Sequence, residues 1–301
     1  MKAPLVSIII PAYRAGRYIT ETLESIRSQT HTAWEVLVCE DGIVDDTRDR
    51  VEAFAATTTQ PVRLFQNPSN RGVSHSRNRL LDAAQGEFIA FIDADDLWGP
   101  NHLAHSLERM NAERTDWIIG GTNLLASDGS VIKRDILPHP LPLAQIPTRL
   151  LAYNFILTGA AVFSRRVFTD GLRFDPTLTI GEDLDLWIRV IAAGHRPSFS
   201  DVATFNYRKH PASATGDSAN FAEGMAALYS KYLNNPIVDR RECRNGLFQN
   251  LTVTTRMTRR TQPDRSLRAA RQLFRLHPLH PSSWLYLARA KLAFTAPPRA
   301  A

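Results

Sequence analysis

Three carboxylates, Asp93, Asp95 and Asp96, directly follow the apolar run of residues 88–92. Side chains two apart on a strand point to the same face, roughly 6.5–7 Å apart, so Asp93 and Asp95 can address one ligand together. Converging carboxylates repel one another and lose hydration, and a hard cation such as Mg2+ or Mn2+ relieves both costs. The pattern therefore predicts a divalent metal site with Asp95 and Asp93 as ligands. A solvated turn that caps a helix starting near Pro100 is the alternative.

Apolar runs and amphipathic segments alternate through the N-terminal half of the chain. The runs have the length of buried strands, and the segments between them have the spacing of helices. This alternation predicts a Rossmann-like α/β fold with a doubly wound, mainly parallel sheet, in which ligands bind at the carboxyl ends of the strands. The runs are residues 6–10, 34–39, 62–65 and 88–92, and the segments are residues 19–29, 45–55 and 73–84.

Five short motifs lie at the predicted strand ends and at a helix start near residue 182. They occur in the order found in the family 2 inverting glycosyltransferases, which the chain resembles over roughly residues 4–210. Five motifs in register are far more specific than one, and no GxGxxG or P-loop phosphate motif competes with them. The motifs are residues 6–13, 40–42 with 45–47, 70–72 with 76–78, 93–96, and 181–187.

The resemblance implies the A-type glycosyltransferase fold and transfer of a sugar from a nucleotide diphosphate donor. It implies that Pro11 and Tyr13 lie against the base and that Asp41 accepts a hydrogen bond from the base imide, a role that suits a carboxylate at a strand end. Ile43 and Val44 replace the Ser-Thr that usually follows this Asp-Gly, which leaves the identity of the base open. A plain Asp-Gly turn is the alternative for Asp41.

A second set of residues is expected to handle the phosphates. Arg77 can reach the phosphates or the base with a planar fork of donors, or it can face solvent. The resemblance places Asp93 near the ribose and Asp95 on a metal ion that bridges to the diphosphate, with Asp96 as a second-line ligand. His210 is a further candidate ligand for the metal or phosphate, with a surface histidine as the alternative.

The acceptor hydroxyl needs a general base, and Glu182 and Asp183 are the candidates. The resemblance places a catalytic carboxylate in this Glu-Asp motif. Asp183 is the first choice, and Glu182 follows because a one-residue slip in the loop exchanges their roles. Attack opposite the leaving group needs one base and no covalent intermediate, and it inverts the anomeric carbon. The alternative is that both carboxylates only cap the helix predicted at residues 184–193. Residues 158–163 include small side chains that leave space for a sugar or mark close packing.

Length and composition bound the rest of the molecule. The 301 residues can bury the core of one α/β domain of about 230 residues with an appendage. Cys39 and Cys243 are too few and too distant for a disulfide framework or a zinc site, and Cys39 is expected in the core. We find neither a secretory leader nor an apolar run near the ~20 residues of a membrane span, so we expect a cytoplasmic protein.

The C-terminal segment is strongly basic. Residues 236–301 contain 13 Lys or Arg against 3 Asp or Glu, a net charge of +10, whereas the whole chain carries +6. Arginines between 256 and 275 interleave with Leu267, Leu273, Phe274 and Leu276, and the apolar stretch 284–294 follows. This pattern suits an interfacial helix at an anionic membrane surface. A basic helical hairpin that packs as structure is the alternative, and nucleic-acid binding is not expected because no recognised module accompanies the charge.

These observations predict two parts, a nucleotide-sugar-binding and catalytic domain at residues 1–235 and a basic helical extension at residues 236–301. We expect a metal-dependent inverting glycosyltransferase that acts on a glycan or lipid-linked acceptor in cell-surface polysaccharide synthesis, peripheral at the inner face of the membrane. A sugar nucleotidyltransferase is one alternative, but residues 11–16 match its Gly-rich loop poorly. A catalytically silent nucleotide-binding scaffold subunit is the other.

Overall fold

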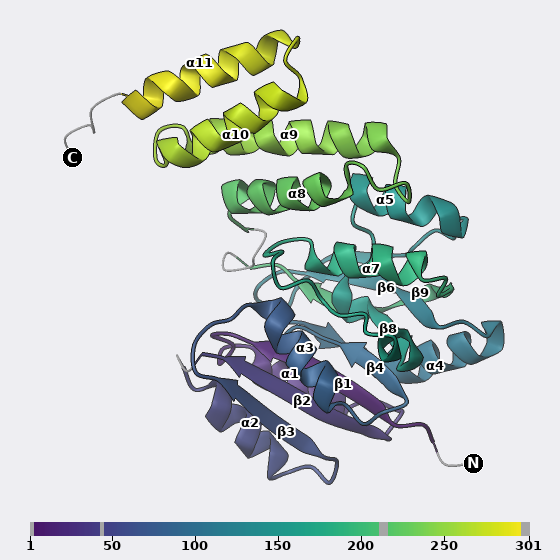
Figure 1. Ribbon diagram of the computed structural model, residues 1–301. Coiled ribbons are helices and arrows are strands. Elements are labelled where there is room, and N and C mark those ends of the chain that lie inside the picture. The colour runs from purple at the N-terminus through teal and green to yellow at the C-terminus, as the bar shows by residue number, and fades with distance from the viewer. Residues whose placement is uncertain (1–2, 43–44, 211–215, 296–301) are drawn as a thin grey trace. The chain divides into compact units, whose positions relative to one another are not determined.

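The computed structural model describes residues 3–42, 45–210 and 216–295 (Figure 1). Four parallel strands confirm the predicted pattern of the N-terminal half, and they lie in the order β3-β2-β1-β4 with Ile8 opposite both Val36 and Ala90. Because they run parallel, their carboxyl ends meet at one edge of the sheet. The strands are β1 (Val6–Ala12), β2 (Trp34–Asp41), β3 (Val62–Asn67) and β4 (Phe88–Phe91).

Five further strands make the sheet mixed beyond β4: β5 (Leu97–Trp98), β6 (Trp117–Leu125), β7 (Val131–Ile136), β8 (Ala161–Ser164) and β9 (Pro197–Arg208). Strand β8 is antiparallel to β4 and to β6, whereas β6 and β9 are parallel. In the described residues the sheet has nine strands, in the order β3-β2-β1-β4-β8-β6-β9-β5 with β7 beside β6. The predicted parallel arrangement thus holds for the first four strands, and antiparallel pairs enter beyond them.

Helices cover both faces of this sheet. One face packs against α1 (Ile19–Arg27), α2 (Thr47–Ala55) and α4 (His102–Glu113). The other packs against α3 (Val73–Ala83), α6 (Arg166–Thr169) and α7 (Glu182–Ala192), and α5 (Ile146–Ala152) contacts α7. Short 3-10 turns lie at η1 (Leu143–Gln145) and η2 (Thr158–Ala160).

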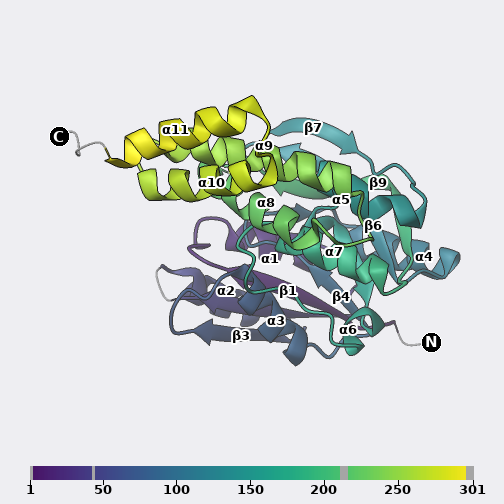
Figure 2. The same cartoon turned by 45° about the horizontal axis from the view of Figure 1, so that its top comes forward.

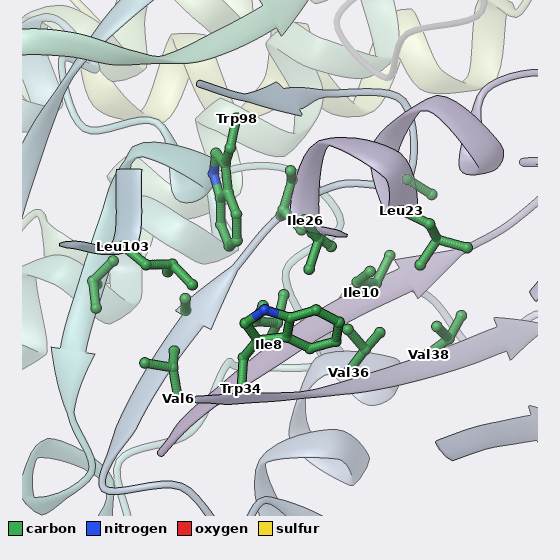
Figure 3. Packing of buried hydrophobic residues seen from close by; sticks show 14 of the residues in the cluster. Val6, Ile8, Ile10, Leu23, Ile26, Trp34, Val36, Val38, Trp98 and Leu103 are labelled. Atoms are coloured by element: carbon green, nitrogen blue, oxygen red, sulfur yellow. The ribbon is translucent and has the colours of Figure 1, made fainter. Parts of the chain in front are cut away.

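Alternate residues of the first strands build the core on the α1 side. Figure 3 shows Ile8 and Ile10 of β1 and Val36 of β2 gathered with Leu23 and Ile26 of α1, and all five are fully buried. This period-2 pattern sets the register of the sheet, because a slip by one residue would turn these side chains to the opposite face. The strand ends that carry the polar motifs are therefore held on a closely packed base.

Aromatic side chains fill the opposite face. Phe163 of β8 contacts Trp117 of β6, at 5.2 Å between ring centroids, and Trp187 of α7, at 4.9 Å, and the two tryptophan rings lie 6.0 Å from each other. Phe91 of β4 meets Phe163 edge to face at 6.0 Å. Because Trp187 is fully buried, it anchors the first turns of α7 against the sheet. The carboxylates at the start of α7 are thereby held at a fixed position.

The chain divides into two compact units after His210 rather than at the predicted residue 235. The difference lies in α8 (Ser218–Tyr232), which packs against α9 (Arg240–Thr258). At this contact the thiol of Cys243 donates a hydrogen bond to the carbonyl of Tyr229, at 3.0 Å. A Cβ on Gly246 would lie 2.2 Å from Cζ of Tyr229, so the two helices approach closely. Helix α8 therefore belongs to the helical unit.

The helical unit also contains α10 (Pro263–Leu276) and α11 (Pro281–Thr295). Leu267, Ala270 and Leu273 of α10 are buried, and Leu267 and Ala270 form a small core with Ala290 of α11. The sequence pattern predicted that the apolar side chains of residues 256–276 face a membrane surface. In the structure Leu267 and Leu273 are buried instead, because the apolar stripe of α10 packs on its neighbouring helices. None of the helices within the described residues is long and apolar enough to cross a membrane.

The small residue Gly159 of η2 is a point of close packing. A Cβ at this position would lie 2.3 Å from Cε2 of the buried Phe205 in β9. The carbonyl of Gly159 also accepts a hydrogen bond from Trp98 Nε1, at 2.7 Å. Of the two explanations for the small side chains of residues 158–163, close packing is therefore correct at Gly159.

We expect Gly159→Ala to lower the free energy of unfolding by about 1–3 kcal/mol, because the buried ring of Phe205 has no room to move away from the added methyl group. Gly99→Ala is the matched control, since its Cβ would meet its nearest atom, the carbonyl oxygen of Thr204, only at 3.4 Å. Denaturant unfolding of both variants measures the difference. Equal stabilities would contradict this account of Gly159.

Candidate active site

Asp41 at the end of β2 holds the loop that follows β3. Its Oδ1 accepts hydrogen bonds from Asn67 Nδ2 at 2.8 Å and from the backbone N–H of Arg71 at 2.9 Å, and its Oδ2 accepts one from the N–H of Gly72 at 2.7 Å. Gly72 has a φ of +89°, a conformation that favours glycine, and it begins α3. Asp41 is therefore more than a turn residue, and Oδ2 keeps capacity for a further donor.

The residues expected at the base lie at the end of the neighbouring strand. Pro11 pairs in register with Cys39 of β2, and Tyr13 follows β1 with 46% of its surface exposed. The guanidinium of Arg14 lies 5.3 Å from the centre of the Tyr13 ring. Tyr13 thus offers a partly exposed aromatic ring at the end of the strand that neighbours β2. Ile43 and Val44, which depart from the family pattern, lie outside the described residues.

Arg77 is a buried bridge between two carboxylates. Its Nη2 donates to Asp93 Oδ1 at 2.7 Å and its Nη1 donates to Glu182 Oε1 at 2.9 Å. The guanidinium also lies 5.1 Å from the centre of the Phe174 ring. The alternative of a solvent-facing arginine is wrong, because Arg77 is only 2% exposed. Through Arg77, the end of β4 and the start of α7 are tied together, although they are far apart in sequence.

Asp95 and His210 form a second pair near the end of β4. His210 Nε2 lies 2.7 Å from Asp95 Oδ2, and the His210 ring packs 5.2 Å from the ring of Tyr18. Burial, and then the charge of Asp93, raise the pKa of Asp95. The structure thus brings these two predicted metal ligands together, and the alternative of a surface histidine is not supported.

Asp93 does not join them in a metal cluster. Its carboxylate is half-exposed and pairs with Arg77, which neutralises it. Within the described residues, no group of three or more His, Cys, Asp or Glu side chains is arranged to hold a metal ion. Of the predicted ligands, Asp95 pairs with His210 and Asp93 pairs with Arg77. The pair of Asp95 and His210 still suits Mg2+ or Mn2+, because Mg2+ commonly takes one or two carboxylates and fills its other positions with phosphate oxygens and water.

Asp96 has a structural role that the sequence did not indicate. Its Oδ1 accepts a hydrogen bond from the backbone N–H of Arg208 at 2.8 Å, and its carboxylate is almost fully buried. Burial raises its pKa well above the ordinary value. The prediction of a second-line metal ligand is therefore not supported, because this carboxylate is directed into the protein.

Arg208, the last residue of β9, has a role in the site that the sequence did not assign to it. Its Nε donates to the carbonyl of Asp95 at 3.0 Å, and its Nη2 donates to the Glu21 carboxylate at 2.6 Å. Its guanidinium lies 4.7 Å from the ring centre of Tyr18. Arg208 thus fixes the backbone of Asp95 and the ring beside His210. The available signal was its position at the end of the predicted strand, two residues before the candidate ligand His210.

Glu182 and Asp183 open α7, which begins after Gly181 in the left-handed conformation, with a φ of +77°. Burial, and then the charge of Asp183, raise the pKa of Glu182 to about 7. Burial also raises the pKa of Asp183. Neither side chain occupies the N-cap position of α7. Glu182 pairs with Arg77 instead, so the alternative that both carboxylates only cap the helix does not hold for Glu182.

The two carboxylates differ in how firmly they are held. Asp183 Oδ1 accepts the N–H of Leu184 at 2.8 Å, whereas its Oδ2 has only long contacts, 3.4 Å each, to Asn154 Nδ2 and Thr158 Oγ1. Glu182 Oε1 accepts a hydrogen bond from Arg77 Nη1 within a buried ion pair. One oxygen of Asp183 thus has only long contacts, and it lies beside Thr158 of η2.

Comparison with known proteins agrees with this geometry. The family model described as "Glycosyl transferase family 2" matches residues 7–172. The chain is 29% identical over 190 residues to a UDP-Glc:alpha-D-GlcNAc-diphosphoundecaprenol beta-1,3-glucosyltransferase, WfgD, of Escherichia coli, covering 62% of this chain and 70% of that protein. It is 29% identical over 216 residues to the succinoglycan biosynthesis protein ExoO of Rhizobium meliloti, covering 68% of this chain and 61% of that one.

Solved structures share the fold. The structure of S. aureus TarS 1–349 in complex with UDP-GlcNAc matches with a TM-score of 0.66 and 21% identity, over 96% of this chain and 89% of that chain. The mannosyltransferase PcManGT from Pyrobaculum calidifontis, in complex with GDP-Man and Mn2+, matches with a TM-score of 0.61 and 18% identity, over 98% of this chain and 86% of that chain. With the family match across more than half of the sequence, these findings show that the chain belongs to glycosyltransferase family 2 and is a glycosyltransferase of the A-type fold.

Proposed function

We propose that the protein transfers a sugar from a nucleotide diphosphate donor to a hydroxyl of a glycan or lipid-linked acceptor, with inversion at the anomeric carbon. The observation that carries this proposal is the bridge through Arg77, which joins the strand end that carries Asp93 and Asp95 to the buried carboxylates of α7. A donor-side group and a base-side group are thereby held at one site. The polysaccharide-related names of the relatives support cell-surface polysaccharide synthesis as the setting.

The donor nucleotide is proposed to lie along the ends of β1 and β2. Tyr13 offers an exposed ring for stacking, and Asp41 Oδ2 can accept one more hydrogen bond, from the imide of a base. Asp93, fixed by Arg77, has an exposed side that can accept a ribose hydroxyl. UDP-GlcNAc and GDP-Man in the related structures support a nucleotide diphosphate sugar as the donor class.

Asp95 and His210 would hold a Mg2+ or Mn2+ ion on the diphosphate. When bound, such an ion neutralises the charge of the leaving diphosphate as a Lewis acid. Asp95 fits this role because its pKa is raised by burial and by its acidic neighbour, so an added positive charge would favour its ionised form. Arg208 holds the backbone of Asp95 in place for this contact.

Asp183 is proposed as the general base, and Glu182 as its positioning neighbour. Asp183 Oδ2 would take the proton of the acceptor hydroxyl while the hydroxyl oxygen attacks the anomeric carbon and the bond to the diphosphate breaks. A carboxylate with a raised pKa binds that proton more readily than an ordinary aspartate. Glu182 is held by Arg77 and so stays beside the reaction without taking part in it.

We place the reaction at the inner face of an anionic membrane. The basic charge of residues 236–301 supports this location, and a lipid-linked acceptor would be presented there. The donor assay below also separates the enzyme from a catalytically silent scaffold, because a scaffold would bind nucleotide without transferring or hydrolysing the sugar.

Asp95→Asn should abolish the Mn2+-dependent part of nucleotide diphosphate binding while the fold survives, because the amide is a weaker ligand for a hard cation. Calorimetric titration of UDP and GDP, with and without Mn2+, measures the effect. Asp170→Asn, at an exposed aspartate after α6, is the control and should bind like the wild type. Metal-dependent affinity that is retained in Asp95→Asn would contradict the assignment.

Asp183→Asn should leave donor binding near the wild-type level and lower the rate of transfer by about 10^2–10^4-fold, the usual contribution of general base catalysis. Glu182→Gln should cause a smaller loss. The rate is measured as steady-state sugar transfer, or as donor hydrolysis when no acceptor is added. If Glu182→Gln is the severe variant and Asp183→Asn is mild, the two roles are exchanged, and if both are mild the motif has no catalytic role.

The pKa of Glu182 should fall below about 7 in the Asp183→Asn variant, because the negative charge of Asp183 is one cause of its elevation. Carboxyl carbon chemical shifts of labelled glutamate, followed against pH in the wild type and in the variant, measure this change. The Glu182→Gln variant identifies the resonance. An unchanged pKa would show that the charge of Asp183 does not contribute to the elevation.

A further inference from the structure

Helix α11 is apolar on two opposite sides. On its inner side, Ala290 is buried and Leu287 packs with it against the small core that includes Leu267 and Ala270 of α10. Its outer side is exposed and contains large apolar side chains. Such a helix usually has both sides covered, because an apolar surface in water is unfavourable.

The outer side forms a continuous apolar strip, here called the outer face of α11. Its members are far more exposed than core residues: Trp284 at 59%, Leu285 at 47% and Leu292 at 70%. Residues 285, 288 and 292 follow the i, i+3, i+7 spacing of one helical face. Ala288 is also exposed, so the strip is uninterrupted along a helix of about 22 Å. Figure 2 shows α11 beside α10, at the outside of the helical unit.

Cationic side chains border this face. Arg289 and Lys291 are exposed and, at 100° per residue, project on either side of the line through Ala288. Arg268, Arg271 and Arg275 on α10 are exposed as well. An apolar strip between cationic borders is the arrangement that lies in the plane of an anionic bilayer surface.

Trp284 is held in a position that suits a membrane interface. Its Nε1 donates to the carbonyl of Pro278 at 2.8 Å, and its ring meets Phe274 edge to face at 4.6 Å between centroids. More than half of the side chain nevertheless remains exposed. Tryptophan is enriched at the boundary between lipid and water, where part of the ring is apolar and the N–H is satisfied.

We propose that the outer face of α11 docks onto an anionic phospholipid surface. This proposal rests on the proposed function, since a lipid-linked acceptor is presented at such a surface. A second copy of the chain is a less suitable occupant, because two-fold pairing of the same face would bring Arg289 and Lys291 of both copies together. The docking residues lie in α11, not along the arginine-rich α10, whose leucines are interior.

The test compares full-length variants in flotation with vesicles of phosphatidylcholine alone or mixed equally with phosphatidylglycerol. Leu285→Gln with Leu292→Gln should weaken binding to the anionic vesicles about 10-fold or more, because two large side chains no longer enter the interface. Val131→Gln with Ile132→Gln is the matched control, since it removes two exposed apolar side chains from β7 and should bind like the wild type.

A charge variant tests the electrostatic part. Arg289→Gln with Lys291→Gln should also bind anionic vesicles more weakly, and its binding should depend less on salt than that of the wild type. Raising the salt from 0.1 to 1 M shortens the screening length from about 10 to about 3 Å, so the charge contribution is removed while the apolar part persists. Thermal unfolding followed by circular dichroism confirms that each variant is folded, and Leu292→Gln alone replaces the double variant if that one is unstable.

Two results would overturn the proposal. One is binding by the Leu285→Gln, Leu292→Gln variant that equals the wild type or the β7 control. The other is a wild-type dimer in light scattering that this variant abolishes, with no vesicle binding by the wild type, which would make the face a self-association surface. Calorimetry with UDP-sugars in the absence of vesicles separates this proposal from the proposed function. Lipid binding without nucleotide-sugar binding would leave docking intact and reject the catalytic function.

Discussion

The site depends on one buried group, the guanidinium of Arg77. It satisfies Asp93 at the end of β4 and Glu182 at the start of α7, two carboxylates from distant parts of the chain. Removing one partner of a buried ion pair typically costs about 3–5 kcal/mol, because a charge is left without compensation. Arg77 therefore fixes the distance between the proposed donor side and the proposed base. It also lies 5.1 Å from the ring of Phe174, which closes off one side of the guanidinium.

Burial of the carboxylates, with incomplete compensation by positive charge, explains the remaining electrostatics of this edge. Arg77 compensates Asp93 and Glu182, and His210 contacts Asp95, but burial still raises the pKa of Asp95, Glu182 and Asp183. Such clustered, incompletely compensated carboxylates are typical of sites that receive a cation or a proton during function. The two pairs then have separate tasks in the proposed reaction, since Asp95 would meet the metal and Asp183 the acceptor hydroxyl. Arg208 keeps the first pair in place from β9.

The helical unit contrasts with the catalytic unit in how it uses apolar surface. In the catalytic unit, both faces of the sheet are covered by helices and the buried side chains form continuous layers. In the helical unit, α10 covers its apolar stripe with α9 and α11, while α11 keeps an exposed apolar side. The basic charge of this segment is thus displayed around an apolar face rather than mixed into it. This separation of charge and apolar surface underlies the proposed contact with anionic lipid.

The sequence by itself determined the strand pattern and the five motifs, and it singled out Asp41, Asp95 and Asp183 as candidates, because local periodicity and residue order are properties of the linear chain. Only the tertiary structure decided which charges are paired. It paired Asp93 with Arg77, directed Asp96 to the backbone of Arg208, and assigned α8 to the helical unit. It also introduced the antiparallel strands beyond β4. Partner choice depends on which side chains meet across distances of tens to a hundred residues, and no local pattern encodes that meeting.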